Sequence, residues 1–527
     1  MTRRMTGAVV AAVSIAMLSA TALALTSCTA AGPDSSSAGI PDAAIEVMNQ
    51  PEYANGQWAI YAEDLETGEV LIDHESDLFL QPGSFVKTYS SGAAWLQFGP
   101  DSTIITPVKQ TGDVVDGVLQ GDLVLVGQGD LTMGGRTKAD GSVDFTNLDH
   151  NDANPLPGAT LTTEDPLTGL NDLAAQVKAA GIDAVAGDIV IDDRLFSGKL
   201  VGEIVSPIVI NQNVIDVLVT PGAMGEQATV ELIPAVAPWT IDVDVETVAA
   251  GTDATLGNPV SETDGSISIS GTIAADADPQ LKVVVFKDPA TFARTAFIEA
   301  LQRAGVAVTA DPVAVNSTAG LAEFAAVEAL PSVAELESLP LAEEVTYVMK
   351  VSYNRGAQTL ICRLAVTAGS NKCDDGIPVA GEIWRAAGLD TNDTVIIDGS
   401  GLDGNYITAI NAVNVQRIMA EGPDAQRWRD TMPILGVDGS LATVQTDSES
   451  AGKVFAKTGT LLGGDFFNGE VRFRLATNTL GGVIEAEGGR TVLFTIMVNN
   501  GVVPTLEDVF VANNDVGAVA AAIQQAF

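Results

Sequence analysis

A serine and a lysine three residues apart, Ser84 and Lys87, are the first residues of this sequence that could do chemistry together. A serine hydroxyl becomes a useful nucleophile when a neighbouring base takes its proton. Histidine often serves as that base, but the chain has only two histidines, His74 and His150. A lysine can replace histidine when burial or a nearby positive charge lowers its pKa. The spacing therefore predicts that Ser84 is a nucleophile and that Lys87 is its base.

Two further short motifs lie downstream of this pair. Ser352-Tyr353-Asn354 is the one S-x-N tripeptide of the chain, and Lys457-Thr458-Gly459 is its one K-T-G tripeptide. Taken alone, the first can be a cap that links two helices, and the second can be a strand end that turns at glycine. A second S-x-x-K, from Ser450 to Lys453, is interpreted as a coincidence. The ordered set S-x-x-K, S-x-N and K-T-G is much harder to obtain by chance than any one of its members.

Helices and a strand are expected to position these motifs. Pro82-Gly83 breaks the chain, and the segment 84–99 after it is predicted to be a helix. If Ser84 opens that helix, Ser84 and Lys87 share one face, and the helix N-terminus favours negative charge on the serine oxygen. Residues 352–354 lie between two predicted helices, and residues 457–459 lie on a predicted strand.

Composition excludes several classes of function. The chain of 527 residues carries 26 Lys and Arg against 68 Asp and Glu, a formal net charge of −42, so we expect no nucleic-acid partner. Hydrophobic residues make up 46% of the chain, enough for a sizeable core. The histidines and the three cysteines show no metal-ligand spacing, so we expect no metal and no cofactor.

The N-terminal residues indicate export. Two arginines precede an uncharged apolar stretch that ends in Leu25-Thr26-Ser27-Cys28 and resembles a bacterial lipobox. That resemblance implies a signal peptide over 1–27, cleavage before Cys28, and lipidation of its sulfur. Secretory cleavage near Ala30 or an uncleaved membrane anchor are the alternatives. We expect an exported protein, lipid-anchored on the outer face of the cytoplasmic membrane, with a flexible tether over 28–40.

Cys362 and Cys373, eleven positions apart, are the remaining cysteines. In an oxidising compartment they could close a short disulfide loop. The alternative is that Cys362, inside an apolar segment, is a buried free thiol.

The pattern of apolar segments and predicted elements changes twice along the chain. Residues 41–104 and 323–527 contain the motifs, with predicted helices and a few long strands. Residues 105–322 have short apolar runs between Gly, Asp and Thr clusters, interrupted by two helices. We interpret this stretch as a β-rich insert with room for nested subdomains. The fold class expected is α/β (α+β).

The order and the spacing of the motifs resemble those of the serine-type D-alanyl-D-alanine carboxypeptidase/endopeptidases, the class C low-molecular-mass penicillin-binding proteins. Ser84 and Ser352 are 268 residues apart, whereas Ser352 and Lys457 are 105 apart, so the large insert lies between the first two motifs. Strings such as GDLVLVGQGDLTM, GDIVIDDRLF, IIDGSGL and AKTGTLLGG follow in family order. The resemblance runs from about residue 45 to the end of the chain.

This resemblance implies a β-lactamase/transpeptidase-like domain, with an antiparallel sheet flanked by helices, that carries the β-rich insert. It also implies a peptidase that cleaves D-alanyl-D-alanine bonds of peptidoglycan stem peptides, and in addition cross-link bonds, through an acyl-enzyme on Ser84. β-Lactam antibiotics would acylate the same serine. The alternatives are a β-lactamase on the same scaffold and a catalytically idle lipoprotein that binds the cell wall.

The resemblance also assigns roles to individual residues. Lys87 is the base, Ser352 relays a proton to the leaving amine, Asn354 positions the substrate backbone, and Lys457 lowers the pKa of Lys87. Thr458, Gly459 and Thr460 are assigned to substrate binding. Thr458 holds the terminal carboxylate together with Lys457, and Gly459 leaves the strand edge free for the substrate. The N–H group of Thr460 forms the oxyanion hole with that of Ser84.

Three features depart from the family pattern. Tyr353 stands where Asp or Asn is usual, and Gly83 stands where alanine is usual. No E-x-x-L-N string lies between Asn354 and Lys457, so the deacylating glutamate of class A β-lactamases is not evident.

Overall fold

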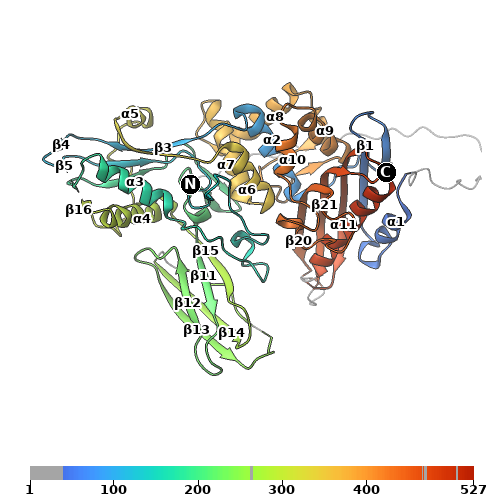
Figure 1. Ribbon diagram of the computed structural model, residues 1–527, viewed down its shortest axis with the longest axis horizontal. Coiled ribbons are helices and arrows are strands. Elements are labelled where there is room, and N and C mark those ends of the chain that lie inside the picture. Colours follow the sequence, from blue (N-terminus) through green and yellow to red (C-terminus); the bar gives the residue numbers. More distant parts are fainter. Residues whose placement is uncertain (1–38, 254, 262–264, 466, 468–471, 506–507) are drawn as a thin grey trace, which may run out of the picture.

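The structure is a computed structural model that describes residues 39–253, 255–261, 265–465, 467, 472–505 and 508–527 (Figure 1). The predicted signal peptide, Cys28 and nearly all of the predicted tether lie outside the described residues. Among the helices that the structure does describe, none combines the length and the apolar character needed to cross a membrane.

A five-stranded antiparallel sheet joins the two ends of the described chain. Its strand order is β2-β1-β22-β21-β20, so strands from the first and the last parts of the sequence pair directly. Strand β20, which carries the K-T-G motif, lies at the edge of the sheet. The strands are β1 (Gln57–Asp64), β2 (Val70–His74), β20 (Val454–Gly464), β21 (Phe473–Glu485) and β22 (Thr491–Val503).

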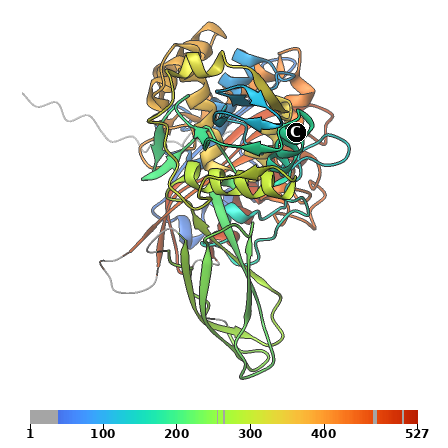
Figure 2. The same ribbon diagram turned by 90° about the vertical axis from the view of Figure 1, so that its left-hand side faces the viewer.

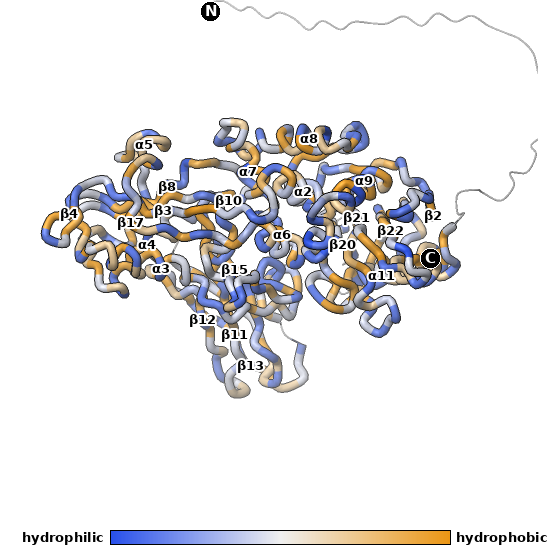
Figure 3. Tube along the Cα trace, turned by 45° about the horizontal axis from the view of Figure 1, so that its top comes forward, coloured by the Kyte–Doolittle hydropathy of each residue, from blue (hydrophilic) through white to orange (hydrophobic). Residues whose placement is uncertain are grey.

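Both faces of this sheet are covered, because alternate residues of a strand point to opposite sides. On β1, Trp58 and Ile60 belong to the core beneath α1 (Asp42–Met48) and α11 (Asp508–Ala526), whereas Ala59 and Tyr61 belong to the core on the other face. Figure 3 shows hydrophobic segments concentrated along these strands and helices.

Helix α2 begins at Lys87, the last residue of the S-x-x-K motif, and packs in the core on the face of the sheet that contains Ala59 and Tyr61. Its residues from Lys87 to Trp95 are all buried. Gly92 lets Trp384 pack against it, since a Cβ there would lie 2.5 Å from the indole ring. The helices of this face are α2 (Lys87–Phe98), α6 (Leu341–Lys350), α7 (Asn354–Thr367), α8 (Gly376–Ala386), α9 (Ala409–Ala420) and α10 (Ala425–Asp430).

The inserted region has its own core, built on a mixed sheet with strand order β17-β3-β6-β8. Helix α4 begins as its sequence predicts, with Asp288 accepting a hydrogen bond from Thr291 N at 3.0 Å. These elements are β3 (Ile105–Gln110), β6 (Leu123–Val126), β8 (Ile189–Asp192), β17 (Ser332–Glu337), α3 (Thr168–Ala179) and α4 (Pro289–Arg303). Strand β17, which comes after the predicted boundary at residue 322, pairs with β3.

A β-module protrudes from the inserted region (Figures 1 and 2). It has one sheet of order β12-β11-β15 and a parallel pair β13-β14. Its strands are β11 (Val214–Thr220), β12 (Thr229–Ile233), β13 (Thr240–Val248), β14 (Ser266–Ala274) and β15 (Gln280–Val285). The shorter elements are β4 (Val114–Val115), β5 (Val118–Leu119), β7 (Ala184–Val185), β9 (Gly198–Leu200), β10 (Glu203–Val205), β16 (Ala307–Val308), β18 (Thr394–Val395), β19 (Tyr406–Ile407) and α5 (Phe324–Glu328).

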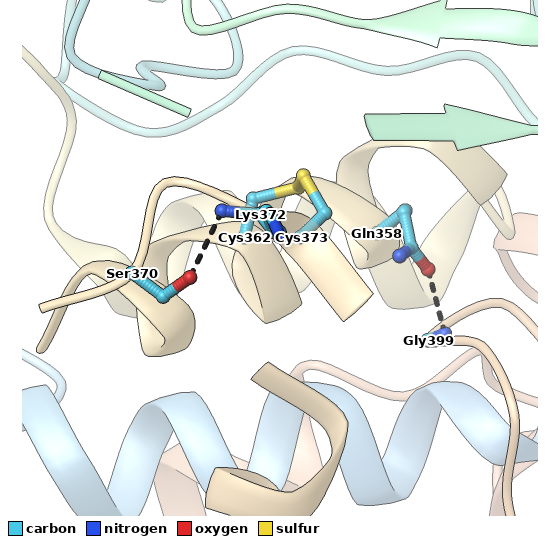
Figure 4. Close-up of a disulfide and its surroundings, with 6 residues drawn as sticks. All are labelled: Gln358, Cys362, Ser370, Lys372, Cys373 and Gly399. Atoms are coloured by element: carbon cyan, nitrogen blue, oxygen red, sulfur yellow. Dashed lines mark hydrogen bonds between the residues drawn. A yellow bond between two sulfur atoms is a disulfide. The ribbon is translucent and has the colours of Figure 1, made fainter. Parts of the chain in front are cut away.

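Cys362 of α7 and Cys373 are joined by a disulfide, with their Cα atoms 4.0 Å apart (Figure 4). Ser197 of the inserted region exchanges backbone hydrogen bonds with this loop, including Cys373 N to Ser197 O at 3.1 Å. The bridged loop therefore contacts the inserted region directly.

Candidate active site

Ser84 lies on a short 3-10 helix, η3 (Gly83–Val86), that runs directly into α2. The sequence predicted that Ser84 opens an α-helix. In a 3-10 helix the residues i and i+3 eclipse each other, because one turn takes three residues. The Nζ atom of Lys87 consequently lies 2.7 Å from the Oγ atom of Ser84.

The amine of Lys87 has two other partners, and both can only accept hydrogen bonds from it. Its Nζ donates to Asn354 Oδ1 at 2.6 Å and to the backbone carbonyl of Ser400 at 2.8 Å. A neutral amine has two N–H bonds and one lone pair. With both N–H bonds directed at these oxygens, the lone pair is left facing the hydroxyl group of Ser84.

The segment 398–401 holds that carbonyl in place. The carboxylate of Asp398 accepts hydrogen bonds from the backbone N–H groups of Ser400 and Gly401, both at 2.7 Å. Gly399 N donates to Gln358 Oε1 of α7 at 2.8 Å, which Figure 4 shows beside the disulfide. The segment is thus fixed to the same helix that provides Asn354.

The S-x-N and K-T-G motifs meet on the other side of the serine. Ser352 has a left-handed backbone conformation, φ 58°, in the connection between α6 and α7. Its Oγ accepts a hydrogen bond from Lys457 Nζ at 3.0 Å. Lys457 Nζ also donates to the backbone oxygen of Thr458 at 2.9 Å, and the Thr458 hydroxyl is 2.8 Å from that of Ser440.

Burial lowers the pKa of both lysines, and repulsion by Lys457 adds to the effect at Lys87. Lys87 and Lys457 are each 0% exposed, and an ammonium group loses hydration when it is buried. Burial lowers the pKa of Lys87 well below its usual range, and the positive charge of Lys457 lowers it further. Burial also lowers the pKa of Lys457, to about 7.

Gly459 lies against the serine turn. A Cβ at this position would lie 2.0 Å from the carbonyl oxygen of Pro82, just before that turn. The glycine therefore lets β20 pack against η3. Gly83, with φ +56°, makes the reciprocal approach, since its Cβ would lie 2.9 Å from Thr460 N.

Tyr353 points away from the serine. Its side chain is 2% exposed and its ring lies 5.5 Å from that of Tyr347 in a small buried cluster. The second S-x-x-K is remote from these residues, because Ser450 is buried against α11, where its hydroxyl donates to Gln524 Oε1 at 2.8 Å.

Several residues that complete the site are not predicted by the sequence motifs. Ser400, Asp398 and Ser440 lie in segments that contain no catalytic motif of their own. In the inserted region, burial raises the pKa of Asp152 to about 6, and the positive charges of Lys87 and Lys457 act to lower it. The spacing of residues within a motif gives no information about contacts between segments that are far apart in the sequence. Among the described residues, no group of three or more His, Cys, Asp or Glu side chains is arranged to hold a metal ion.

Comparison with known sequences finds one family over most of this chain. The model of the D-Ala-D-Ala carboxypeptidase 3 (S13) family matches residues 42–515. The chain is 30% identical over 454 residues to the D-alanyl-D-alanine carboxypeptidase of Actinomadura sp. (strain R39), a match that covers 81% of this chain and 77% of the relative. It is 29% identical over 179 residues to carboxypeptidase DacB of Mycolicibacterium smegmatis, which covers 32% and 36%.

Comparison with solved structures finds the same architecture. Penicillin binding protein 4 (dacB) of Haemophilus influenzae has a TM-score of 0.67 at 18% identity, covering 92% of this chain and 99% of that chain. The same protein complexed with a β-lactam has a TM-score of 0.62 at 20% identity, covering 86% and 92%. The predicted fold class, an α/β transpeptidase-like domain with a β-rich insert, is confirmed.

The close packing of β20 against η3 can be tested by adding one methyl group. We expect Gly459→Ala to lower the rate at which a fluorescent penicillin labels the protein by about 100-fold, because a displacement of about 1 Å has effects of that size. Gly463→Ala is the matched control, since a Cβ at Gly463 on the same strand meets nothing within 4 Å. Equal labelling rates for the two variants would contradict this description of the site.

Proposed function

The chain belongs to the D-Ala-D-Ala carboxypeptidase 3 (S13) family, and from that premise we propose that Ser84 attacks the carbonyl of the D-alanyl-D-alanine bond in peptidoglycan stem peptides. The protein is a serine hydrolase of the penicillin-binding type. The bond that is cleaved and the roles of the individual residues are proposed below.

The observation that carries the proposal is the environment of Lys87. Its Nζ lies 2.7 Å from Ser84 Oγ, and its two remaining neighbours are acceptors. A neutral lysine in this position can take the proton of Ser84 as the serine oxygen bonds to the carbonyl carbon. Burial and the charge of Lys457 both favour the neutral form.

The remaining motif residues supply the other parts of an acyl transfer. The N–H groups of Ser84 and Thr460 stabilise the oxyanion, at about 3–4 kcal/mol for each donor in comparable sites. Because β20 is an edge strand, one row of its backbone groups is not used by the sheet. Asn354 orients the substrate backbone, and Lys457 with Thr458 binds the terminal carboxylate.

Ser352 carries the proton from Lys87 to the leaving group. As the C–N bond breaks, the proton held by Lys87 passes through Ser352 to the leaving amine, and D-alanine departs. Water then attacks the ester on Ser84, Lys87 accepts the proton of the water, and Lys87 returns that proton to Ser84 Oγ as the ester bond breaks. Cleavage of a peptide cross-link follows the same steps with a different leaving amine.

The nucleophile is tested by intact-mass spectrometry of residues 29–527 incubated with benzylpenicillin. We expect a persistent covalent adduct on the peptide that contains Ser84, and Ser84→Ala should abolish both the adduct and the release of D-alanine. Ser450→Ala, in the second S-x-x-K, is the control. It should keep both the adduct and the release of D-alanine, because Ser450 is buried against α11. Labelling that survives in Ser84→Ala would place the nucleophile elsewhere.

The same measurement separates the rival functions. An antibiotic that is consumed without an adduct indicates a β-lactamase. An antibiotic that stays intact without an adduct indicates an idle protein that binds the cell wall.

We further propose that the protein is exported and attached to the outer face of the cytoplasmic membrane through a lipid on Cys28. The apolar stretch after Arg3 and Arg4 and the residues Leu25-Thr26-Ser27-Cys28 support this proposal. They are the parts of a lipoprotein signal.

The anchor is tested by fractionation of cells that express the full chain. We expect the protein in the membrane fraction and Cys28→Ala in the soluble exported fraction, because the substitution removes the lipidated sulfur. Cys373→Ala, which removes a different cysteine, should leave the membrane association unchanged. Equal membrane association of Cys28→Ala would rule out the lipid anchor.

A further inference from the structure

A short hairpin of the inserted region lies against the helix that carries Asn354. The hairpin consists of β9 and β10, which pair antiparallel, and both strands contact α7. One strand touches the disulfide between Cys362 and Cys373, and the other forms an ion pair with the residue that follows Asn354. The hairpin therefore connects the bridged loop with the S-x-N motif.

At the disulfide, the hairpin and the bridged loop are in direct contact. A Cβ atom on Gly198 would lie 2.6 Å from both the Cβ and the Sγ of Cys373, so β9 begins against the bridge itself. Ser197 N donates to Asn371 O at 2.8 Å, and Cys373 N donates to Ser197 O at 3.1 Å. The position of the hairpin thus depends on where the bridge holds the loop. The buried side chains of this cluster are Phe196, Leu200, Val205, Cys362 and Cys373.

At its other strand, an ion pair attaches the hairpin to the site. Arg355 Nη1 donates to Glu203 Oε2 at 2.7 Å. Arg355 is the residue after Asn354, whose Oδ1 accepts a hydrogen bond from Lys87 Nζ at 2.6 Å. The Glu203 side chain is 45% exposed, and an ion pair with a half-exposed partner is a weak attachment. The ion pair alone therefore holds the hairpin only weakly.

The second oxygen that accepts from Lys87 lies beside the same cluster. Leu402 packs against the side chains around the bridge. It follows closely on Ser400, whose carbonyl oxygen accepts from Lys87 Nζ at 2.8 Å. The hairpin therefore adjoins both segments that orient this amine. A cavity of about 300 Å³ has walls from the hairpin and from the site, among them Leu200, Glu203, Asn354 and Leu402.

We propose that formation of the Cys362–Cys373 disulfide activates the acylation of Ser84. The bridge fixes the loop that supports β9 and β10, and the fixed hairpin keeps the two oxygen acceptors of Lys87 in place. The chain with two free thiols is a folded but slow form. This inference rests on the proposed function, and it makes the two cysteines positioning residues for the base.

The activating step is a thiol–disulfide exchange with an external disulfide, such as glutathione disulfide or a disulfide carrier protein. One cysteine thiolate attacks a sulfur of that disulfide, forms a mixed disulfide and releases the first thiol. The second cysteine thiolate attacks the mixed disulfide, so that the S–S bond of the protein forms and the second thiol leaves. Two cysteine thiols are oxidised, the external disulfide is reduced to two thiols, and the protons pass through solvent to the released thiolates.

The compartment decides which form accumulates. The cytoplasm keeps thiols reduced, whereas oxidising compartments outside it supply disulfides for this exchange. A protein that is exported as proposed above would therefore become fully active after export.

The test compares the rates at which a fluorescent penicillin labels the open and the bridged form of residues 29–527, which contain only these two cysteines. The open form is purified under a dithiol reductant and closed with glutathione disulfide, and intact mass follows the loss of two hydrogens. We expect closure to raise the labelling rate about tenfold, less than the roughly 100-fold effect of a displacement of about 1 Å. Cys362→Ala/Cys373→Ala should have the rate of the open form and should not respond to glutathione disulfide.

Hydrogen exchange shows where the effect arises. In the double-alanine variant, the amides of 197–205 should exchange faster, whereas those of α2 should keep their protection, because the bridge holds the hairpin and not the core. A general loss of stability would instead raise exchange throughout the protein.

A double-mutant cycle tests whether the bridge acts through the hairpin. Glu203→Ala removes the ion pair with Arg355. It should lower the labelling rate less than about twofold in the bridged protein and more than about fivefold in the double-alanine variant, because the hairpin there depends on the ion pair. Lys199→Ala is the matched control, since Lys199 is exposed on the same hairpin, and it should leave both rates unchanged.

Equal labelling rates of the open and the bridged form would overturn the proposal, as would thiols that stay open in glutathione disulfide. Raised exchange throughout the double-alanine variant, or an equal effect of Glu203→Ala in both backgrounds, would also overturn it. The absence of any acyl-enzyme on Ser84 in the bridged protein would contradict the proposed function instead.

Discussion

Two lysine side chains are fully buried in this protein, and the cost of burying their charges constrains the rest of the site. An ammonium group without water or a counter-charge is strongly unfavourable, so at least one amine gives up its proton. For Lys87, burial and the charge of Lys457 both lower the pKa, and the neighbours of its amine are Asn354 Oδ1, the Ser400 carbonyl and the Ser84 hydroxyl. In the proposed reaction this amine is the base, and it is held in position by a helix buried from Lys87 to Trp95.

The three motifs come together because each lies at a junction of elements that cannot shift independently. Ser84 lies where η3 enters α2, Ser352 lies between α6 and α7, and Lys457 lies on the edge strand β20. Glycines at 83 and 459 allow the serine turn and the strand to touch through their backbones. The inserted region contributes a buried network of Arg136, Asp149, His150 and Asp216.

Much of this arrangement could be predicted from the sequence, because it depends on local signals. The helix after Asp288 and the hairpin of β1 and β2 follow from capping and alternation, and the motif order led to the correct family. Contacts between distant segments could not be predicted in the same way. The approach of Pro82 to Gly459 and the pairing of β17 with β3 both depend on tertiary packing. His150 offered no motif, and its partners lie on separate strands and turns.

The central claim is that Lys87 is neutral in the resting protein, and a direct titration of its amine tests it. Lysines labelled with ¹⁵N at Nζ would be followed by NMR between pH 5 and 11, with Lys87→Met used to assign the signal. Our account predicts that Lys87 carries no proton charge at pH 7 and that its amine titrates far below the exposed lysines. A signal of Lys87 that stays that of an ammonium group up to pH 10 would contradict the account, because the serine would then have no base.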